Sequence, residues 1–170
     1  MKKAASVFLR KNIDRQDMIL LAQWLGNGQI TRYLNEHRSS VYELSRLADT
    51  VPEPMLGDHL NRYGHFFMIC PGDGQAIGFV KLARTAVAGE YEIVYAIGEE
   101  SLRGQGYGKT AIGKALTFAF ADLRAVSVIA KINPENTRSR RLAAACGFRE
   151  VGLSGEMTLF QAASELKIPR

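Results

Sequence analysis

A chain of 170 residues is long enough for one compact domain with its own hydrophobic core, and it is too short for two domains of ordinary size. Its hydrophobic content of 46%, charged content of 23% and net charge of +5 are those of a soluble globular protein. No stretch approaches the roughly 18 consecutive apolar residues that a membrane-spanning helix needs, which excludes a transmembrane protein.

The first half of the chain alternates apolar runs with turn-forming residues. Asp14, with Asp17 three residues later, has the pattern of a helix cap. Residues 71–74, Pro-Gly-Asp-Gly, are a strong turn signal between two strands. In chain order we expect a strand at 7–13, a helix from 14 to about 25, a helical turn at 30–34, a helix after Ser39 and Ser40, a break at 51–54, an ambiguous segment at 55–62, and strands at 65–70 and 76–84.

The second half contains the longest predicted helix, which begins at Tyr107 directly after a glycine-rich run. In chain order we expect a strand at 90–97, a helix from 107 to about 123, a strand at 125–132, a helix at 134–145, and two strands at 148–153 and 156–161. Three consecutive strands before the glycine-rich run favour a mixed sheet of α/β or α+β type over a regular doubly wound one.

The cysteines and the amino terminus favour a cytoplasmic protein. Cys70 and Cys146 lie far apart and form no C-x-x-C pair, so we expect thiols in a reducing compartment and no metal site. The three histidines form no ligand pattern either. Near the amino terminus, Arg10 and Lys11 interrupt the apolar run that a secretory signal peptide would need.

The positive charge is concentrated in one segment. Residues 103–149 hold nine basic and two acidic side chains, whereas the remainder holds 13 basic and 15 acidic ones. Such a field suits a polyanionic ligand, although a solvated helix face accounts for part of the charge. The segment lacks basic side chains interleaved with stacking aromatic residues, which argues against nucleic acid.

Residues 103–109, Arg-Gly-Gln-Gly-Tyr-Gly-Lys, join the strand at 90–97 to the long helix. Three glycines at alternate positions let the backbone approach a ligand closely, and a helix beginning there directs unpaired N–H groups outward. This arrangement predicts a site for phosphate or pyrophosphate.

Two common nucleotide motifs fit this loop poorly. Gly108, Lys109 and Thr110 supply the end of a Walker A loop, but Arg103 stands where its first glycine is required. Residues 106–111 match a relaxed dinucleotide fingerprint, G-x-G-x-x-[GA]. The acidic residue expected about 20 positions later is missing, because Lys-Ile-Asn occupies residues 131–133.

A third motif fits the whole neighbourhood. Residues 103–108 resemble the Q/R-x-x-G-x-G/A acetyl-CoA loop of the GCN5-related N-acetyltransferase (GNAT) superfamily. Asn-Pro-Glu-Asn-Thr-Arg-Ser at 133–139 and Cys-Gly-Phe at 146–148 resemble the N-x-x-S…G-F segment of the same superfamily. Further runs, among them Tyr-Glu-Ile at 91–93 and Phe-Ala-Phe at 118–120, are similar to its ribosomal-protein N-terminal (alanine/serine) acetyltransferase branch. The resemblance spans residues 7–160.

The resemblance implies a fold and a cofactor. The expected fold is one domain over residues 1–170, with a core at about 7–160 and a loose tail at 161–170. It has a mostly antiparallel mixed sheet of six to seven strands, splayed between strands 4 and 5 and flanked by about four helices. The residues that would contact acetyl-CoA are Ala96, Ile97, Arg103, Gly104, Gln105, Gly106, Tyr107, Gly108, Lys109 and Asn136.

The catalytic groups depart partly from the superfamily pattern. Many members have a tyrosine seven residues after the asparagine, where it protonates the departing thiolate, but this chain has Ala143 there. Ser139, three residues after Asn136, is the remaining hydroxyl, and the ribosomal-protein branch resembles this chain in having that serine without the tyrosine. Glu92 is the expected general base, with Glu156 in reserve.

Other interpretations of these residues stay open. Arg103 and Lys109 are also plausible as surface charge, and Asn136 and Ser139 as helix-capping or packing residues. Glu92 could be a solvated strand residue, and Cys146 is expected to be a small packed residue and not a nucleophile.

The sequence therefore predicts an acetyl-CoA-dependent N-acetyltransferase that acts on a primary amine by direct attack in a ternary complex. The alternative is a non-catalytic acyl-CoA-binding protein of the same fold. The acceptor, a peptide N-terminus or a small-molecule amine, would be selected by residues 26–60 and 85–89. Acidic side chains there could attract a cation or form ordinary surface: Glu36, Glu43, Asp49, Glu53 and Asp58. We expect a monomer or a homodimer.

Overall fold

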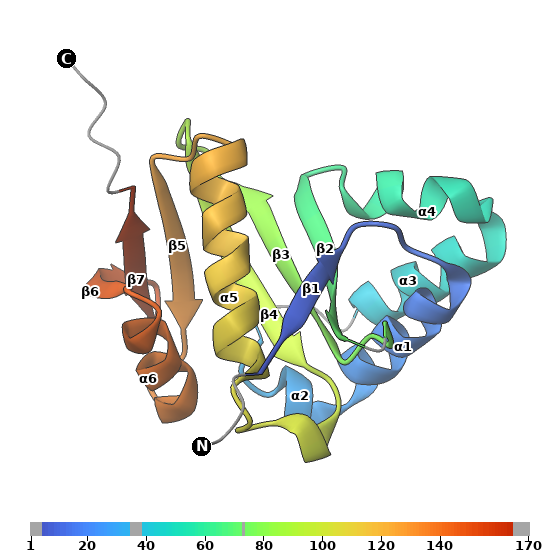
Figure 1. Ribbon diagram of the computed structural model, residues 1–170, viewed down its shortest axis with the longest axis horizontal. Coiled ribbons are helices and arrows are strands. Elements are labelled where there is room, and N and C mark those ends of the chain that lie inside the picture. Colours follow the sequence, from blue (N-terminus) through green and yellow to red (C-terminus); the bar gives the residue numbers. More distant parts are fainter. Residues whose placement is uncertain (1–4, 35–38, 73, 165–170) are drawn as a thin grey trace.

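The computed structural model describes residues 5–34, 39–72 and 74–164 (Figure 1). Its strands are β1 (Val7–Arg10), β2 (Gly64–Pro71), β3 (Gly78–Arg84), β4 (Glu90–Ile97), β5 (Ser127–Ile132), β6 (Arg149–Ser154) and β7 (Met157–Ala163). They form one seven-stranded sheet in the order β1-β2-β3-β4-β5-β7-β6. Neighbouring strands are antiparallel except β4 and β5, which are parallel. The predicted mostly antiparallel mixed sheet is confirmed.

Helices cover both faces of this sheet. They are α1 (Arg15–Gly26), α2 (Gly28–Thr31), α3 (Ser39–Thr50), α4 (Glu53–Leu60), α5 (Tyr107–Thr117) and α6 (Thr137–Ala145). A 3₁₀ turn, η1 (Glu100–Leu102), precedes the glycine loop, and a π-helical turn, η2 (Phe118–Asp122), continues α5. The sequence predicts a helix at each of the places occupied by α1, α3, α5 and α6.

The strand pleat divides the core into two clusters. In β2, Phe67 and Ile69 pack with α5 on one face of the sheet. Phe66 and Met68 point the other way and pack with α1, α3 and α4. Figure 1 shows α5 crossing the central strands on one side, with α1, α3 and α4 grouped at the other.

A capping box and an ion pair join β1 to α1. The Asp14 carboxylate accepts the Asp17 N–H at 2.8 Å, and the Asp17 carboxylate accepts the Asp14 N–H at 3.0 Å. Asp17 is 3% exposed, and Arg10 at the end of β1 lies 2.8 Å from it. The predicted helix cap is confirmed.

Several boundaries in the first half of the chain differ from the prediction. The helical turn expected at 30–34 is α2 at Gly28–Thr31, and the strand expected from residue 76 begins at Gly78. The strand expected at 7–13 ends at Arg10, because the chain leaves the sheet there to place Asp14 at the start of α1. The helix break expected at 51–54 covers only residues 51 and 52, because α4 begins at Glu53. Proline is tolerated in the first turn of a helix, so Pro54 lies within α4.

Three boundaries in the second half also differ. The long helix changes to the π-helical turn at Phe118, and α6 begins only at Thr137, because the Asn136 side chain caps it. The tail expected from residue 161 is partly wrong, since Ala163 pairs with Ser127 in the sheet. Other predictions fall outside the described residues: the capping side chains of Ser39 and Ser40, Asp73 of the predicted turn, Glu36, and residues 165–170 of the tail.

The parallel pair of β4 and β5 is short and determines where the site lies. Pairing runs only from Glu90 with Ser127 to Glu92 with Ile129. Beyond Glu92, β4 continues to Ile97 paired only with β3, while β5 pairs with β7. The two strands therefore diverge, and the predicted splay between strands 4 and 5 is confirmed.

Candidate active site

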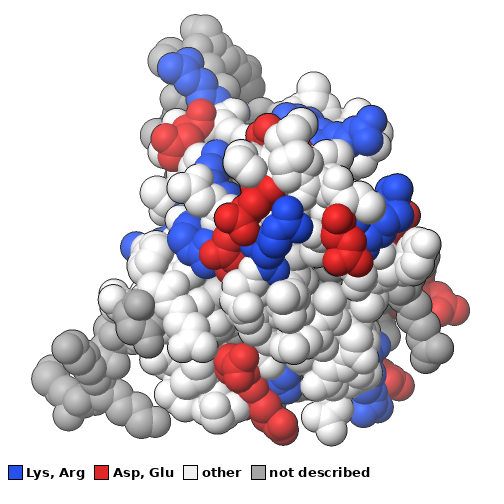
Figure 2. All heavy atoms as spheres, turned by 90° about the vertical axis from the view of Figure 1, so that its right-hand side faces the viewer, with Lys and Arg blue, Asp and Glu red and all other residues white. Residues whose placement is uncertain are grey.

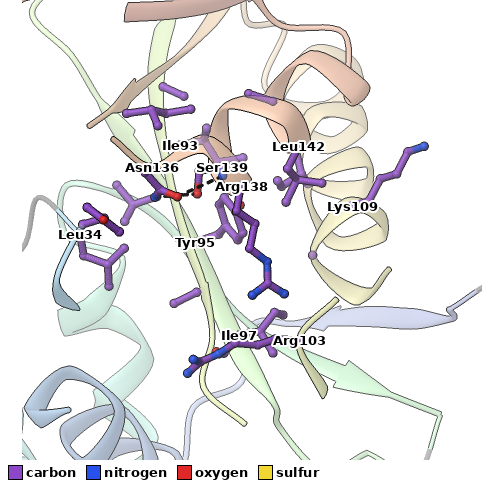
Figure 3. A pocket seen from close by; sticks show the side chains of 18 of the residues that line it. Leu34, Ile93, Tyr95, Ile97, Arg103, Lys109, Asn136, Arg138, Ser139 and Leu142 are labelled. Carbon is purple, nitrogen blue, oxygen red and sulfur yellow. Dashed lines mark hydrogen bonds between the residues drawn. The ribbon is translucent and has the colours of Figure 1, made fainter. Parts of the chain in front are cut away.

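A cleft with a cavity of about 690 Å³ lies where β4 and β5 diverge (Figure 3). The start of α5 and α6 form one wall, and α2 with the residues up to Leu34 forms the other. Because side chains alternate along β4, this strand contributes residues to both walls. Ile93 and Tyr95 face the α5 side of the sheet, whereas Val94 and Ala96 face the α1 side.

The glycine loop forms one end of this cleft. Gly104, with φ of 75°, and Gly106, with φ of 91°, adopt a left-handed backbone conformation that suits glycine. Gly106 is the N-cap of α5, and its position has no side-chain cap. The first N–H groups of α5 therefore lack partners within the helix and are available to an anion.

The third glycine of the loop, Gly108, packs against two other elements. A Cβ atom on Gly108 would lie 3.4 Å from Leu142 Cδ2 and 3.5 Å from Tyr95 Cε2. These side chains come from α6 and β4, and both distances are ordinary van der Waals contacts, so α5 meets both elements at this position. Gly104 and Gly106 therefore give the turn of the loop, and Gly108 lies where α5 meets α6 and β4.

Arg103 reaches back to the end of β4. Its Nε donates to the Ile97 carbonyl oxygen at 3.0 Å, and the side chain is half-buried. This bond orients the guanidinium and leaves its terminal nitrogens for other acceptors. The Ile97 carbonyl, which the resemblance assigns to pantetheine, keeps one lone pair.

The other predicted acetyl-CoA residues fall into two groups. Those that line the cavity are Ala96, Ile97, Arg103, Gly104, Gly106, Gly108, Lys109 and Asn136. The Gln105 side chain instead donates to the Ser101 carbonyl at 2.6 Å, and Tyr107 packs against the core. The role predicted for Gln105 and Tyr107 uses backbone N–H groups, which these side-chain positions do not affect.

Sequence reasoning missed Arg138. It lies in the first turn of α6, and its Nη2 would be 3.4 Å from a Cβ atom on Gly104. Figure 3 shows its guanidinium extending into the gap near Arg103. The available signal was its place in the motif at 133–139, between Asn136 and Ser139.

Asn136 and Ser139 are in direct contact. The Ser139 N–H donates to Asn136 Oδ1 at 3.2 Å, which caps α6. Asn136 Nδ2 donates to Ser139 Oγ at 2.9 Å. Both side chains line the cavity, so helix capping and a place in the site are compatible.

Tyr95 is the second cleft residue that sequence reasoning missed. Its ring extends from β4 toward α6, the helix that carries Ser139 (Figure 3). Burial raises the pKa of Tyr95, and the nearby Ser139 hydroxyl and Arg138 charge partly oppose this shift. The alternation of the strand at 90–97 contained the signal, because it puts Tyr95 on the same face as Ile93.

The predicted base has a basic partner. Glu92 lies at the point where β4 and β5 separate, and its carboxylate is 3.1 Å from Lys131 Nζ on β5. The two side chains are 20% and 29% exposed, and both line the cavity. Sequence reasoning counted Lys131 in the positive charge of its segment and did not place it beside Glu92.

The sequence analysis considered three further residues for a catalytic role: Glu156, Ala143 and Cys146. Glu156 is exposed in the turn between β6 and β7 and does not line the cavity. Ala143 is buried and lines it. Cys146 is half-buried, and burial raises the pKa of its thiol, which disfavours a thiolate nucleophile.

The geometry fits a ligand with a phosphate end and an extended arm. The uncapped start of α5 meets the phosphate end, and the edge of β4 beyond Glu92 leaves backbone groups beside the arm. Among residues 5–34, 39–72 and 74–164, no group of three or more potential metal ligands occurs. In the same part of the chain, no helix is long and apolar enough to span a membrane.

Solved structures share this fold. A spermidine N-acetyltransferase from Vibrio cholerae, in complex with CoA and spermine, superposes with a TM-score of 0.73 at 22% identity, covering 91% of this chain and 92% of that one. A GNAT-family acetyltransferase from Bacillus anthracis gives 0.71 at 16% identity, covering 95% and 96%. A ribosomal-protein-S5-alanine acetyltransferase from Vibrio fischeri gives 0.71 at 16% identity, covering 98% and 97%.

The sequence comparisons identify the family. Comparison with curated proteins gave no match. The acetyltransferase (GNAT) domain matches residues 7–149, which include the glycine loop, Asn136 and Ser139. Because this match covers most of the sequence, the chain belongs to the GNAT acetyltransferase family.

Proposed function

We propose that the protein transfers the acetyl group of acetyl-CoA to a primary amine by direct attack in a ternary complex. The observation that carries this proposal is the cleft between β4 and β5, which ends at the uncapped start of α5. Its two walls give a donor and an acceptor separate approaches to one point. Direct attack requires that arrangement.

The cofactor side of the proposal assigns roles to residues on the α5 wall. Acetyl-CoA supplies an activated acyl group as a thioester. The N–H groups from Gln105 to Lys109 hold its pyrophosphate, supported by the positive end of the α5 dipole. Arg103 and Lys109 add charge, and backbone groups of Ala96 and Ile97 hold the pantetheine arm.

The catalytic side of the proposal uses two side chains. Glu92 takes a proton from the incoming ammonium through a water molecule, and the Lys131 ammonium holds that carboxylate in place. Ser139 gives a proton to the departing sulfur, since Ala143 offers no titratable group.

The acceptor is expected to enter along the α2 wall. Ile30, Tyr33 and Leu34 line the cavity there, and Glu92 faces the same side because it has the parity of Val94. The compared structures include a spermidine acetyltransferase and a ribosomal-protein-alanine acetyltransferase. Small polyamines and protein N-termini are therefore the two acceptor classes to screen. Cys70 and Cys146 are thiols and are not joined by a disulfide, which supports a cytoplasmic location. We expect a monomer or a homodimer.

The competing function is a protein of the same fold that binds acyl-CoA without catalysis. Ala143 is the observation that favours it. Ser139→Ala separates the two functions. An enzyme loses turnover in this variant and keeps acetyl-CoA binding, whereas a binding protein has no turnover to lose.

The first test is calorimetric titration with acetyl-CoA, with ATP and NAD as control ligands. Saturable binding of acetyl-CoA alone would support the assignment, and release of thiol in the presence of amines would then identify the acceptor. Absence of binding would overturn it.

A loop variant tests the same assignment. Gly106→Ala should weaken acetyl-CoA binding at least tenfold, because a side chain strains the left-handed backbone and displaces the N–H groups. Gly155→Ala is the matched control, since Gly155 has a φ of 59° and open space around it in the turn between β6 and β7, outside the cavity lining. Equal affinities in the two variants would contradict the role of the loop.

A further inference from the structure

Charged side chains are unevenly distributed around the cavity. Among the described residues, Glu92 is the one acidic residue that lines it. The basic residues that line it are Arg103, Lys109, Lys131, Arg138 and Arg141. Arg103, Lys109 and Arg138 lie in the glycine loop or beside it, where the phosphates of CoA are expected. Lys131 lies apart from that group, on β5, and pairs with Glu92.

Glu92 and Lys131 lie on the acceptor side of the sheet. Glu92 has the parity of Val94, which packs against the core cluster that contains α1. Lys131 alternates with Ala130 and Ile132, which pack in the cluster that contains α5, so the Lys131 side chain faces the other way. The α2 wall packs against the same cluster as α1. The ion pair and the α2 wall therefore share one face of the sheet.

The α2 wall brings no carboxylate to this face. Its lining residues are uncharged: Gln29, Ile30, Tyr33 and Leu34. The Arg32 guanidinium lies 5.1 Å from the centre of the Tyr33 ring, so one face of that ring already holds a cation. The described acidic side chains of α3 and α4 do not line this cavity. A polyamine would therefore bring several ammonium groups to a single carboxylate that already has a basic partner.

We propose that the acceptor is a zwitterionic monoamine, an α-amino acid: its ammonium faces Glu92, and its carboxylate accepts a hydrogen bond from Lys131 Nζ. This inference rests on the proposed function and narrows its acceptor to one class. The two charged groups of an α-amino acid are attached to one carbon, and those of Glu92 and Lys131 are 3.1 Å apart. Each charge of the acceptor therefore meets its opposite.

Lys131 can hold both carboxylates at once. An ammonium group has three donors, and the contact with Glu92 uses one of them. During transfer, the bond between the amine nitrogen and the acetyl carbon forms as the carbon–sulfur bond breaks. The ammonium proton passes to Glu92 through water, and the sulfur takes the Ser139 proton, as in the proposed function. Lys131 keeps its charge throughout, so its role is to select and orient the acceptor.

The rest of this face fits an apolar amino-acid side chain. Ile30 and Leu34 line the cavity from the α2 wall, Val94 lines it from β4, and all three are half-buried. A branched apolar side chain would gain from contact with them. Leucine is therefore the probe. Leucinamide replaces its carboxylate by a neutral amide, as a peptide N-terminus does, 3-methylbutylamine lacks the group altogether, and spermidine is a polyamine.

Release of CoA thiol measures kcat/KM for these four amines in wild type and in Lys131→Met. In wild type, leucine should have the highest value. Lys131→Met should lower kcat/KM for leucine about tenfold or more relative to 3-methylbutylamine, because a hydrogen bond between charged groups is lost. Each amine has the same basicity in both experiments, so the change in this ratio reports the contact with Lys131. Lys131→Arg keeps the charge and should keep most of the preference.

Lys114→Met is the matched control. Lys114 is exposed on α5 and does not line the cavity, and this variant removes the same charge from the protein. Its ratio of leucine to 3-methylbutylamine should equal that of the wild type. Turnover of 3-methylbutylamine by Lys131→Met shows that this variant is folded.

A binding measurement needs no turnover. Calorimetry titrates leucine into the complex of the protein with CoA. The wild type should bind leucine about tenfold or more tightly than Lys131→Met does, since the same hydrogen bond is lost. Lys114→Met should bind it as the wild type does.

The outcomes separate this inference from the proposed function. Equal ratios in wild type and Lys131→Met, or a higher wild-type kcat/KM for leucinamide or spermidine than for leucine, would overturn the acceptor class and leave acetyl transfer standing. Leucine binding that depends on Lys131, in a protein that acetylates none of the four amines, would support the acceptor site and overturn catalysis. A protein that binds neither CoA nor leucine would overturn both.

Discussion

Arg138 and Arg103 approach the glycine loop from different elements, one from the first turn of α6 and the other from the segment before α5. Arg103 is oriented by its bond to Ile97, whereas Arg138 extends freely into the gap (Figure 3). Guanidinium groups bind phosphate oxygens through paired N–H donors. Two such groups beside an uncapped helix start suit the pyrophosphate of CoA.

Arg138→Ala should weaken acetyl-CoA binding about tenfold, because a hydrogen bond to a charged group contributes about 1.5 kcal/mol or more. Titration calorimetry at constant ionic strength measures the change. Arg149→Ala is the control, since Arg149 is exposed on β6 and does not line the cavity. Equal weakening of acetyl-CoA binding in both variants would mean that Arg138 contributes only through the net charge of the protein.

Gly98 has no room for a side chain, because the Trp24 ring packs directly against it. A Cβ atom there would lie 2.2 Å from Trp24 Cε2, in the buried ring of α1. We expect Gly98→Ala to destabilise the protein by about 1–3 kcal/mol, because the ring must move. Gly113→Ala, on an exposed helix position with open space, should stabilise it by about 0.5–1 kcal/mol. Urea unfolding of both variants measures the difference, and an unchanged Gly98→Ala midpoint would contradict the contact.

At the scale of elements, short local signals explain where helices begin. The cap of α1 and the Asn136 cap of α6 were both readable as residue patterns, and both occur in the structure. Element boundaries that depend on pairing with a strand distant in the sequence were not predicted. The end of β7 was mistaken for tail, because Ala163 is held by pairing with Ser127, 36 positions earlier and unknowable from local pattern.

The connection of β1 to α1 depends on Asp17. Its carboxylate is buried and paired with Arg10, so Asp17→Ala should destabilise the protein by about 3 kcal/mol by leaving a guanidinium without its partner. The exposed pair Arg46–Glu43, at 3.3 Å, is the control, and Glu43→Ala should cost less than about 1 kcal/mol. Denaturant unfolding compares them. Similar losses in the two variants would contradict the importance of burial.

At the scale of the whole molecule, the excess of positive charge lies in the part of the chain that forms the candidate site. The face that carries α3 and α4 shows acidic and basic side chains interspersed (Figure 2). The basic excess belongs to residues 103–149, which supply the loop, α5 and α6. A polyanion is therefore attracted to the cleft end of the molecule.

Global stability should fall in acid partly through His65. Burial lowers its pKa, and the charges of Lys11 and Arg84 add to this, so the folded protein binds the proton more weakly than the unfolded chain. The stability that His65 contributes is complete above the ordinary pKa of 6.5 and is lost as the pH falls through the lower folded value. His65→Phe keeps the ring contact with Phe118 and removes the titration.

Unfolding midpoints between pH 7.5 and pH 5 measure this contribution. The loss of stability over that range should be smaller in His65→Phe than in the wild type. His59→Gln, an exposed control on α4, should follow the wild type. A His65→Phe curve parallel to the wild type would contradict the prediction.

The sequence by itself determined the family, the glycine loop and the residues at 133–139, because each depends on a run of adjacent side chains with one local purpose. Only the tertiary structure decided which side chains meet. The Glu92–Lys131 pair, the approach of Arg138 to the loop, and the meeting of Tyr95 and Leu142 beside Gly108 all join separate elements. Such contacts depend on where β4 and β5 diverge, and that divergence is set by pairing with β3 and β7, which no local pattern encodes.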